Sequence, residues 1–202
     1  MPSAQAATPA KVPADGLVAL PPWLNPRKMQ TVKEVALLLN AMRDGGVIRD
    51  YALFGAAAQM RYTEPVATLD ADVLVALPAP DRIDVLGPIY KFCRARGYEA
   101  EGEAIRVGAW PVQFVPVFNL LTRDALAAAE TADFDGAPFR VVDAAHLAVI
   151  ALSVGRAKDF ARVLALLESE AVTREQVAEL AAREGLAEAW TRFAWRFLDE
   201  RP

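Results

Sequence analysis

Apolar residues recur along this chain with helical spacing in some segments and as short continuous runs in others. The segment TVKEVALLLNAMRDGG, residues 31–46, has its apolar positions on one helical face and ends at two glycines. Thr31 is followed three residues later by Glu34, which is the pattern of a capping box. We therefore expect a helix whose N-cap is Thr31 and which stops at Gly45.

Short apolar runs in the middle of the chain predict strands that alternate with helices. YALF ends at Gly55, and AAAQMRY, a segment of helical composition, follows it directly. The run LDADVLVAL is β-branched and apolar except for its two acids, and a helix is expected between residues 81 and 97. AIRVG and VQFVPVF are strand-like, and the turn residues Gly108 and Pro111 between them predict a pair at the edge of the sheet.

The last third of the chain is predominantly helical in pattern. FDGAPFRVV predicts one more hairpin, and four helical segments follow it. Gly155 and Gly185 occupy C-cap positions, and Thr173 with Gln176 repeats the capping-box pattern. The predicted fold is α/β (α+β), with a small mixed β-sheet and a C-terminal helical subdomain.

These patterns divide the chain into three predicted parts. Residues 1–28 are rich in proline and alanine, and the prolines of LPPWLNPRK exclude a helix, so a flexible tail and linker are expected there. Residues 29–120 form the predicted core, and residues 121–202 form the mainly helical subdomain. Neither a signal-peptide pattern nor an apolar run of membrane-spanning length occurs in the sequence, which predicts a cytoplasmic protein without a membrane partner.

Composition narrows the range of partners. With 202 residues, 54% of them hydrophobic and 24% charged, the chain is able to bury a substantial core. Its formal net charge of −4 does not favour nucleic acid as a partner, although a local basic patch is compatible with that total. The single cysteine, Cys93, has no partner for an intrachain disulfide.

Asp70 and Asp72 are the main candidates for chemistry. If LDADVLVAL is a strand, a spacing of two puts both carboxylates on one face, with Cα atoms roughly 7 Å apart. Isolated carboxylates at the start of a buried strand are unfavourable unless a cation compensates them. Mg²⁺ (or Mn²⁺) fits this role, because Mg²⁺ takes one or two protein carboxylates and completes its shell with water and substrate phosphates. The alternative is a solvated pair of acids without function.

Gly55 supports the first interpretation. It precedes Asp70 by fifteen positions, at a strand-to-helix turn where backbone N–H groups are able to hold a phosphate. A hydrophobic residue, a glycine and a small residue, followed by an acid-x-acid strand, resemble the core of the nucleotidyltransferase superfamily. The matching residues are Phe54, Gly55, Ala56, Asp70, Ala71 and Asp72.

A second segment strengthens the resemblance. VVDAAHLAVIALSVGRAKDFARVLALLE is similar to the C-terminal signature of the AbiEii-like toxin and related bacterial nucleotidyltransferase groups, through Gly155, Arg156, Lys158 and Asp159. The resemblance implies a nucleotidyltransferase-like core in residues 29–120, a nucleoside triphosphate as substrate, and a role for Lys158 at its phosphates. A helical charge pair of Lys158 with Asp159 is the alternative.

The chain also departs from the family pattern. Ala56 replaces a serine whose hydroxyl would contact a phosphate, and Val66 stands where many groups have a basic residue. The third carboxylate of the family falls at Gln113 on VQFVPVF, and an amide oxygen binds a metal less strongly and cannot act as a general base. Metal ligands are therefore expected at Asp70, Asp72 and, as a neutral ligand, Gln113.

Two functions from different classes are compatible with these residues. The first is a metal-dependent nucleotidyltransferase in which Asp70 and Asp72 are catalytic, with Gly55, Ala56 and Lys158 binding the nucleotide. Its acceptor would be RNA, a protein or a small molecule, and a toxin–antitoxin role is implied by the resemblance. The second is a catalytically inactive nucleotidyltransferase-like protein that binds or regulates a protein partner.

Two further groups are interpreted as structural. His146, the only histidine, begins a helical segment without a nucleophile motif beside it. Trp190, Phe193 and Phe197 share one face of the last helical segment, which predicts packing rather than stacking on a nucleotide base.

Overall fold

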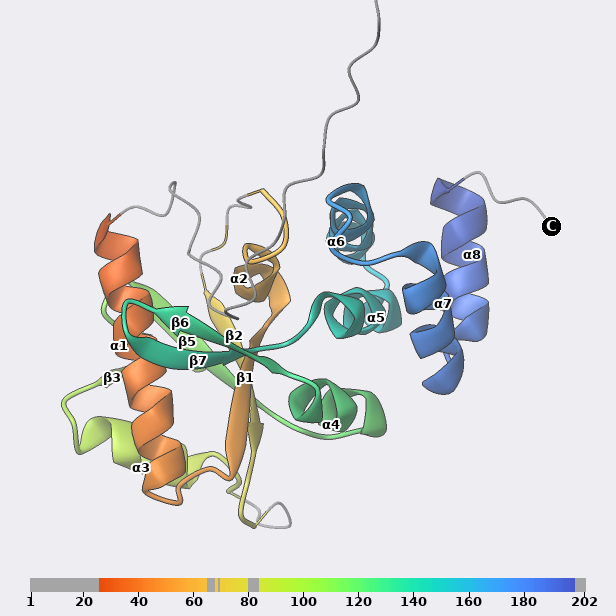
Figure 1. The fold of residues 1–202 in the computed structure, drawn as a ribbon. Coiled ribbons are helices and arrows are strands. Elements are labelled where there is room, and N and C mark those ends of the chain that lie inside the picture. The colour runs from red at the N-terminus through yellow and green to blue at the C-terminus, as the bar shows by residue number, and fades with distance from the viewer. Residues whose placement is uncertain (1–25, 65–67, 69, 80–83, 199–202) are drawn as a thin grey trace, which may run out of the picture.

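A mixed β-sheet forms the centre of the molecule in this computed structural model, which describes residues 26–64, 68, 70–79 and 84–198. Its strands are β1 (Asp50–Phe54), β2 (Ala71–Ala76), β3 (Glu99–Glu101), β4 (Ala104–Val107), β5 (Trp110–Pro116), β6 (Glu130–Phe134) and β7 (Ala137–Val141). They lie in the order β3-β4-β5-β2-β1-β7-β6 (Figure 1). The prediction of an α/β fold with a small mixed sheet is confirmed.

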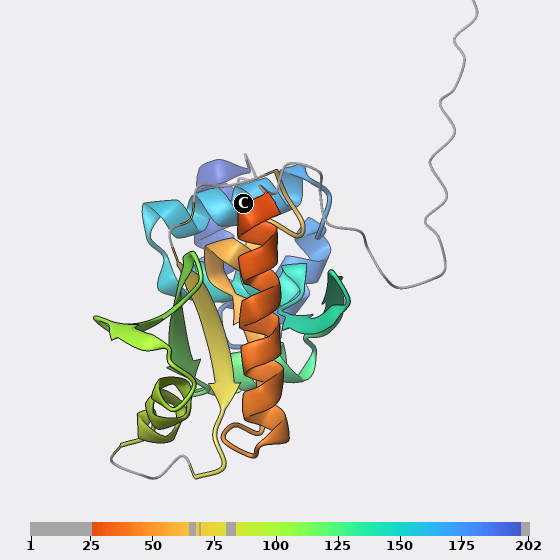
Figure 2. The same ribbon diagram turned by 90° about the vertical axis from the view of Figure 1, so that its left-hand side faces the viewer.

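Helices surround this sheet and continue beyond it. They are α1 (Pro26–Asp44), α2 (Gly55–Gln59), α3 (Gly87–Arg94), α4 (Leu120–Ala127), α5 (Ala144–Val154), α6 (Ala157–Glu168), α7 (Arg174–Arg183) and α8 (Ala187–Phe197). Helix α1 lies along one face of the sheet, as Figure 2 shows in front view, and contacts β5, β7 and β6. The helices α5 to α8 form a layered group on the other side (Figure 1).

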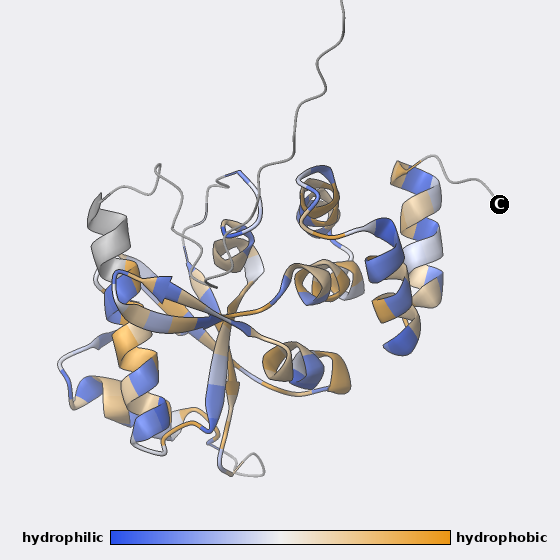
Figure 3. Ribbon diagram, viewed as in Figure 1, coloured by the Kyte–Doolittle hydropathy of each residue, from blue (hydrophilic) through white to orange (hydrophobic). Residues whose placement is uncertain are grey.

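The two central strands are buried because both of their faces are covered. Strand β2 pairs with β1 in antiparallel and with β5 in parallel orientation, and Val73, Leu74 and Val75 are inaccessible to solvent. Such continuous apolar strands are typical of a sheet with helices on both sides. Hydropathy is distributed accordingly in Figure 3, where β2 and α5 carry much of the hydrophobic colour.

Several predicted boundaries agree with the structure. Helix α5 ends at Gly155, whose φ of 71° is the left-handed conformation expected of a glycine cap. Helix α7 begins with the expected reciprocal capping box between Thr173 and Gln176. The expected hairpin in FDGAPFRVV is formed by β6 and β7, and β1 and β2 lie where YALF and LDADVLVAL predict them. Local patterns therefore located most elements.

Other expectations are wrong. Helix α1 begins at Pro26, not after an N-cap at Thr31, because a proline is tolerated in the first turn of a helix. Strands β4 and β5 pair with each other as expected, but this pair is not at the sheet's edge, because the short strand β3, which was not predicted, lies beyond β4. Helix α4 was also missed. The prediction for Val66 and most of the tail lie outside the described residues.

The sheet contains strands from both sides of residue 120. Strand β7 pairs with β1 in parallel orientation through Leu53 and Val141, so the hairpin of β6 and β7 extends the sheet that the earlier strands form. The division into a core and a helical subdomain stays a prediction. Within the described ranges, no helix is both long enough and apolar enough to cross a membrane.

Candidate functional site

Asp70 and Asp72 lie at the beginning of β2. Asp72 is the second residue of the strand, and Asp70 is the residue directly before the strand begins. In the register of the sheet, Asp72 lies opposite Phe54 of β1 and opposite Gln113 of β5. Side chains at paired positions of adjacent strands leave the sheet on the same side. The structure therefore brings Gln113 next to Asp72, although the two residues are far apart in the sequence.

Gly55 lies against the Asp72 carboxylate. It follows Phe54, the last residue of β1, and begins α2 with a φ of 70°. A Cβ atom at this position would overlap the side chain of Asp72, with its carboxylate oxygen Oδ2 as the nearest atom. Both the backbone conformation and the close approach thus require glycine. Ala56 follows in the first turn of α2 and is half-buried.

Thr68 stabilises the backbone ahead of β2. Its hydroxyl donates to the carbonyl oxygen of Asp70 at 3.0 Å and lies 3.3 Å from the Asp70 carboxylate. Asp70 is therefore held by local contacts with the Thr68 side chain, whereas Asp72 belongs to the regular ladder. No hydrogen bond to the Asp72 carboxylate is formed by any residue that the structure describes.

The electrostatic surroundings of Asp72 combine burial with opposing charges. Burial raises the pKa of the Asp72 carboxyl above its ordinary value of 3.8, and the nearby charge of Asp70 raises this pKa further. Three cations of the α6 segment lower it: Arg162, Lys158 and Arg156. The net direction is upward, so the neighbouring cations compensate the buried acid only in part.

The same cations surround a second, fully buried acid. Asp159 is 1% exposed and accepts a hydrogen bond from Arg156 Nε at 2.7 Å and another from Arg162 Nη1 at 3.5 Å. Arg162 also donates from Nε to Gln59 Oε1 at 3.2 Å, which joins α6 to α2. Burial lowers the pKa of Arg162, and the charges of Asp159 and Asp72 oppose this effect.

The structure thus brings together the sequence candidates Asp70, Asp72, Gly55 and Gln113, and it places Lys158 within electrostatic range of them. Sequence reasoning missed Arg162 and Gln59. A signal for Arg162 exists, because it follows Lys158 by four residues and so lies on the same side of α6. Gln59 carried no signal, since its role depends on contact with a distant helix.

The oxygen donors at this position suit a hard divalent cation. Two carboxylates and one amide oxygen are available from Asp70, Asp72 and Gln113, and Mg²⁺ binds such ligands while retaining water or phosphate in its shell. Among the described residues, no group of three or more histidine, cysteine, aspartate or glutamate side chains is arranged to hold a metal ion. A cation would therefore need ligands from a substrate in addition to these residues.

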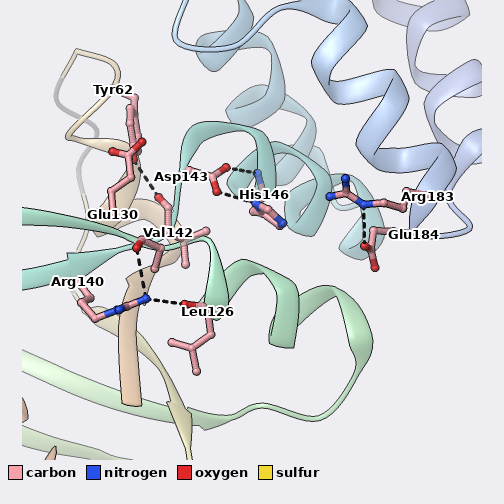
Figure 4. Close-up of polar contacts among 10 residues, drawn as sticks. Tyr62, Leu126, Glu130, Arg140, Val142, Asp143, His146, Arg183 and Glu184 are labelled. Atoms are coloured by element: carbon pink, nitrogen blue, oxygen red, sulfur yellow. Dashed lines mark hydrogen bonds and ion pairs between the residues drawn. The ribbon is translucent and has the colours of Figure 1, made fainter.

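His146 belongs to a separate polar group at the start of α5 (Figure 4). Its Nδ1 lies 2.7 Å from Asp143 Oδ2, and the Asp143 side chain also accepts from the backbone N–H of His146. Although burial acts to raise it, the pKa of Asp143 is lowered below its ordinary value by these hydrogen bonds and by the charge of His146. The pair caps α5, which agrees with a structural role for His146.

Three aromatic residues of α8 pack against one another or against α6, whereas Trp195 is 60% exposed. The rings of Trp190 and Phe193 are stacked, with their centroids 5.7 Å apart. Phe160 of α6 contacts both Phe193 and Phe197. Trp190 and Phe193 are buried. The expectation of packing is confirmed for this face of the helix.

Comparison with known proteins relates the fold to nucleotidyltransferases. No protein-family model and no curated protein sequence matches the chain. An antigenic nucleotidyltransferase-like protein from Paracoccidioides brasiliensis matches in structure with a TM-score of 0.58 and 13% identity, over 87% of this chain and 91% of that one. The antibiotic-resistance factor ANT(2'')-Ia matches with a TM-score of 0.51 and 12% identity, over 86% of this chain and all of that one (100%).

These similarities concern the fold. At 12% and 13% identity, the shared feature is the arrangement of sheet and helices, and it extends over most of the chain. The chain therefore has a nucleotidyltransferase-like fold. Neither match singles out an AbiEii-like group.

Proposed function

We propose that this protein is a nucleotidyltransferase that uses a nucleoside triphosphate and a divalent cation. The observation that carries the proposal is the Asp72 carboxylate. It is partly buried, its charge is not fully compensated, and it lies beside Gly55, Gln113 and the cations of α6. An uncompensated acid in a protein with a nucleotidyltransferase-like fold is the expected state of a ligand for a metal–nucleotide complex.

In the proposed reaction, a hydroxyl oxygen of the acceptor forms a bond to the α-phosphorus of the triphosphate, and its proton is released to solvent water. The bond between the α-phosphorus and the oxygen that bridges to the β-phosphate breaks, and pyrophosphate leaves. Mg²⁺ (or Mn²⁺), when bound, would neutralise charge on the phosphates. Asp70 and Asp72 would hold it, with the Gln113 amide oxygen as a neutral ligand. Lys158 would attract the phosphates, and backbone N–H groups at Gly55 and Ala56, where α2 begins, would hold them.

Thermal unfolding with ligands tests this proposal. The melting temperature is measured with each of the four ribonucleoside triphosphates, with and without Mg²⁺, because a ligand of the folded state raises it. We expect a Mg²⁺-dependent rise for at least one triphosphate. The doubly substituted variant Asp70→Asn, Asp72→Asn should lose the rise, together with any transfer of label from an α-³²P-labelled triphosphate to acceptors in a cell extract.

A matched control separates the site from general charge effects. Asp124→Asn removes a carboxylate from the exposed side of α4 and should respond to Mg²⁺ and nucleotide as the parent protein does. A Mg²⁺-dependent rise that survives the double substitution would falsify the metal assignment. No rise with any triphosphate would contradict the proposed substrate.

A second function is favoured by Gln113. It occupies the position next to Asp72 where a carboxylate would supply a further charged ligand or a general base, and it supplies neither. A catalytically inactive protein that still binds nucleotide would show the melting-temperature rise without label transfer, and one that binds only a protein partner would show neither. In such an inactive protein, Gln113→Glu would increase the affinity for the metal. In an active enzyme, the rate of label transfer by Gln113→Glu would show whether the neutral ligand limits turnover.

The biological role is a separate hypothesis. The resemblance to AbiEii-like toxins suggests a toxin–antitoxin pair in the cytoplasm, with RNA, a protein or a small molecule as acceptor. Induced expression in a bacterial host tests this idea: growth arrest that requires Asp70 and Asp72 would support it, and normal growth at high expression would contradict it.

A further inference from the structure

The side chain of Arg162 connects Gln59 of α2 with Asp159 of α6. Its side chain is 15% exposed. Its two acceptors, Gln59 and Asp159, are 3% and 1% exposed and belong to different helices. Two buried acceptors on separate elements leave the guanidinium little freedom, because moving it would leave both of them without this partner.

This anchored guanidinium is linked to the proposed metal site through helix α2 and lies within electrostatic range of Asp72. Gly55 and Gln59 are the first and last residues of α2, four positions apart and hence on the same side of its turn. Gly55 is adjacent to the Asp72 carboxylate, and Gln59 holds Arg162. Helix α2 therefore connects the acid with the arginine, and it contacts both β2 and α6.

Arg162 retains donors for a ligand. Its hydrogen bonds use Nε and Nη1, and Nη2 makes none to the part of the chain that the structure describes. A planar guanidinium binds two phosphate oxygens at once, which a lysine cannot do. Arg156 and Lys158 add positive charge at the start of the same helix.

We propose that Arg162 binds the polyphosphate chain of the nucleotide directly, and that Gln59 and Asp159 are positioning residues that orient its guanidinium. The inference rests on the proposed function, but it makes a separate claim. An arginine carries its charge without a metal, so this part of the binding should persist when divalent cations are removed.

Inorganic tripolyphosphate is the probe, because it has the phosphate chain without a base or a sugar. Its dissociation constant is measured by titration calorimetry in the presence of EDTA. We expect binding by the parent protein and a loss of affinity of about tenfold or more in Arg162→Gln, since hydrogen bonds to charged groups are strong. Arg162→Lys should be intermediate, because it keeps the charge and loses the two-point contact.

Arg192→Gln is the matched control. It removes the same charge from the exposed side of α8, where Arg192 pairs with Glu188 at 3.5 Å, and should leave the affinity unchanged. Circular dichroism and the melting temperature without ligand establish that each variant is folded. A folded Arg162→Gln variant with the parent affinity overturns the inference, as does a parent protein that does not bind tripolyphosphate.

The positioning role has its own test. Gln59→Ala should weaken binding by roughly threefold in the parent background and have no further effect in the Arg162→Gln background, because Gln59 acts only through Arg162. Equal effects in both backgrounds would contradict this role. Failure of either test leaves the metal site untouched, since that site is judged by the Mg²⁺-dependent response of the Asp70→Asn, Asp72→Asn variant.

Discussion

Asp72 and Asp159 are two acids of one neighbourhood with opposite surroundings. Asp159 is buried among donors: besides its contacts with the side chains of Arg156 and Arg162, it accepts from the backbone N–H of Arg156 at 3.3 Å. Burial alone would raise the pKa of Asp159, yet the hydrogen bonds and charges of Arg156 hold it below its ordinary value. For Asp72, burial and Asp70 prevail and the pKa is raised.

The difference separates a structural acid from a binding acid. The protein itself compensates the charge of Asp159, so this carboxylate organises the start of α6 and the arginines around it. The charge of Asp72 is left partly uncompensated at the start of a buried strand, which is unfavourable for the protein alone and favourable for binding a cation. The comparison predicts opposite effects of removing the two charges.

The largest expected effect is that of Asp159→Ala. Removing a buried carboxylate leaves the half-buried guanidinium of Arg162 without its charged partner, and we expect the free energy of unfolding to fall by about 3 kcal/mol. Urea denaturation measures the change. Glu188→Ala, which removes an acid that is 94% exposed in its side chain, should change the free energy by less than about 0.5 kcal/mol. Equal effects of the two changes would refute the structural role of Asp159.

Gly55→Ala should have the next largest effect. Its Cβ would overlap the Asp72 carboxylate in a backbone conformation that disfavours side chains, so we expect a loss of roughly 2 kcal/mol in the free energy of unfolding. Truncating Asp72 to alanine removes the overlap with the new Cβ but not the unfavourable backbone conformation at residue 55. In a double-mutant cycle, Gly55→Ala should therefore cost less in the Asp72→Ala background. An unchanged cost would show that the close approach is not the cause.

Asp72→Asn should have the opposite sign. It keeps the shape of the side chain and removes a charge that burial disfavours, so the free energy of unfolding is expected to rise by about 1 kcal/mol near neutral pH. The Mg²⁺-dependent part of nucleotide binding should be lost at the same time. A destabilised Asp72→Asn variant would mean that the cations of α6 compensate this acid fully.

The smallest effect is a change in the pH dependence of stability. Because the pKa of Asp159 is lowered on folding, its contribution to stability is present above its ordinary value of 3.8 and is lost as the pH falls through the lower folded-state value. The pKa of Asp72 is raised on folding, so the pH dependence is the opposite. Its contribution to stability is present below pH 3.8 and is lost as the pH rises through the folded-state pKa.

Urea denaturation between roughly pH 5 and pH 2 measures both contributions. Acid should destabilise Asp159→Asn less steeply than the parent protein, and Asp72→Asn more steeply. Asp143, whose pKa is also lowered, keeps part of the acid dependence in every variant. If the free energy of unfolding changed with pH in the same way in the parent protein, Asp159→Asn and Asp72→Asn, the proposed contrast between the two acids would be wrong.

The sequence by itself determined the features that depend on neighbours along the chain. The turn from strand to helix at Gly55, the acids at the start of β2 and the caps at Gly155 and Thr173 follow from glycine conformation, alternation and capping, all of which act over a few residues. The alternation of these elements was sufficient to predict the fold class. The same local reasoning failed for Pro26. Proline breaks a helix in its interior but is accommodated in the first turn, and α1 begins at this residue.

Only the tertiary structure decided which distant residues meet. The parallel register that sets Gln113 beside Asp72, the interior place of β5, and the contact of Arg162 with Gln59 depend on strand order and helix packing. Strand pairing and helix packing join segments many residues apart, and their energies come from burial of the whole interface rather than from any short pattern. For this reason the acids could be recognised in the sequence, whereas the contact of Arg162 with Gln59 could not.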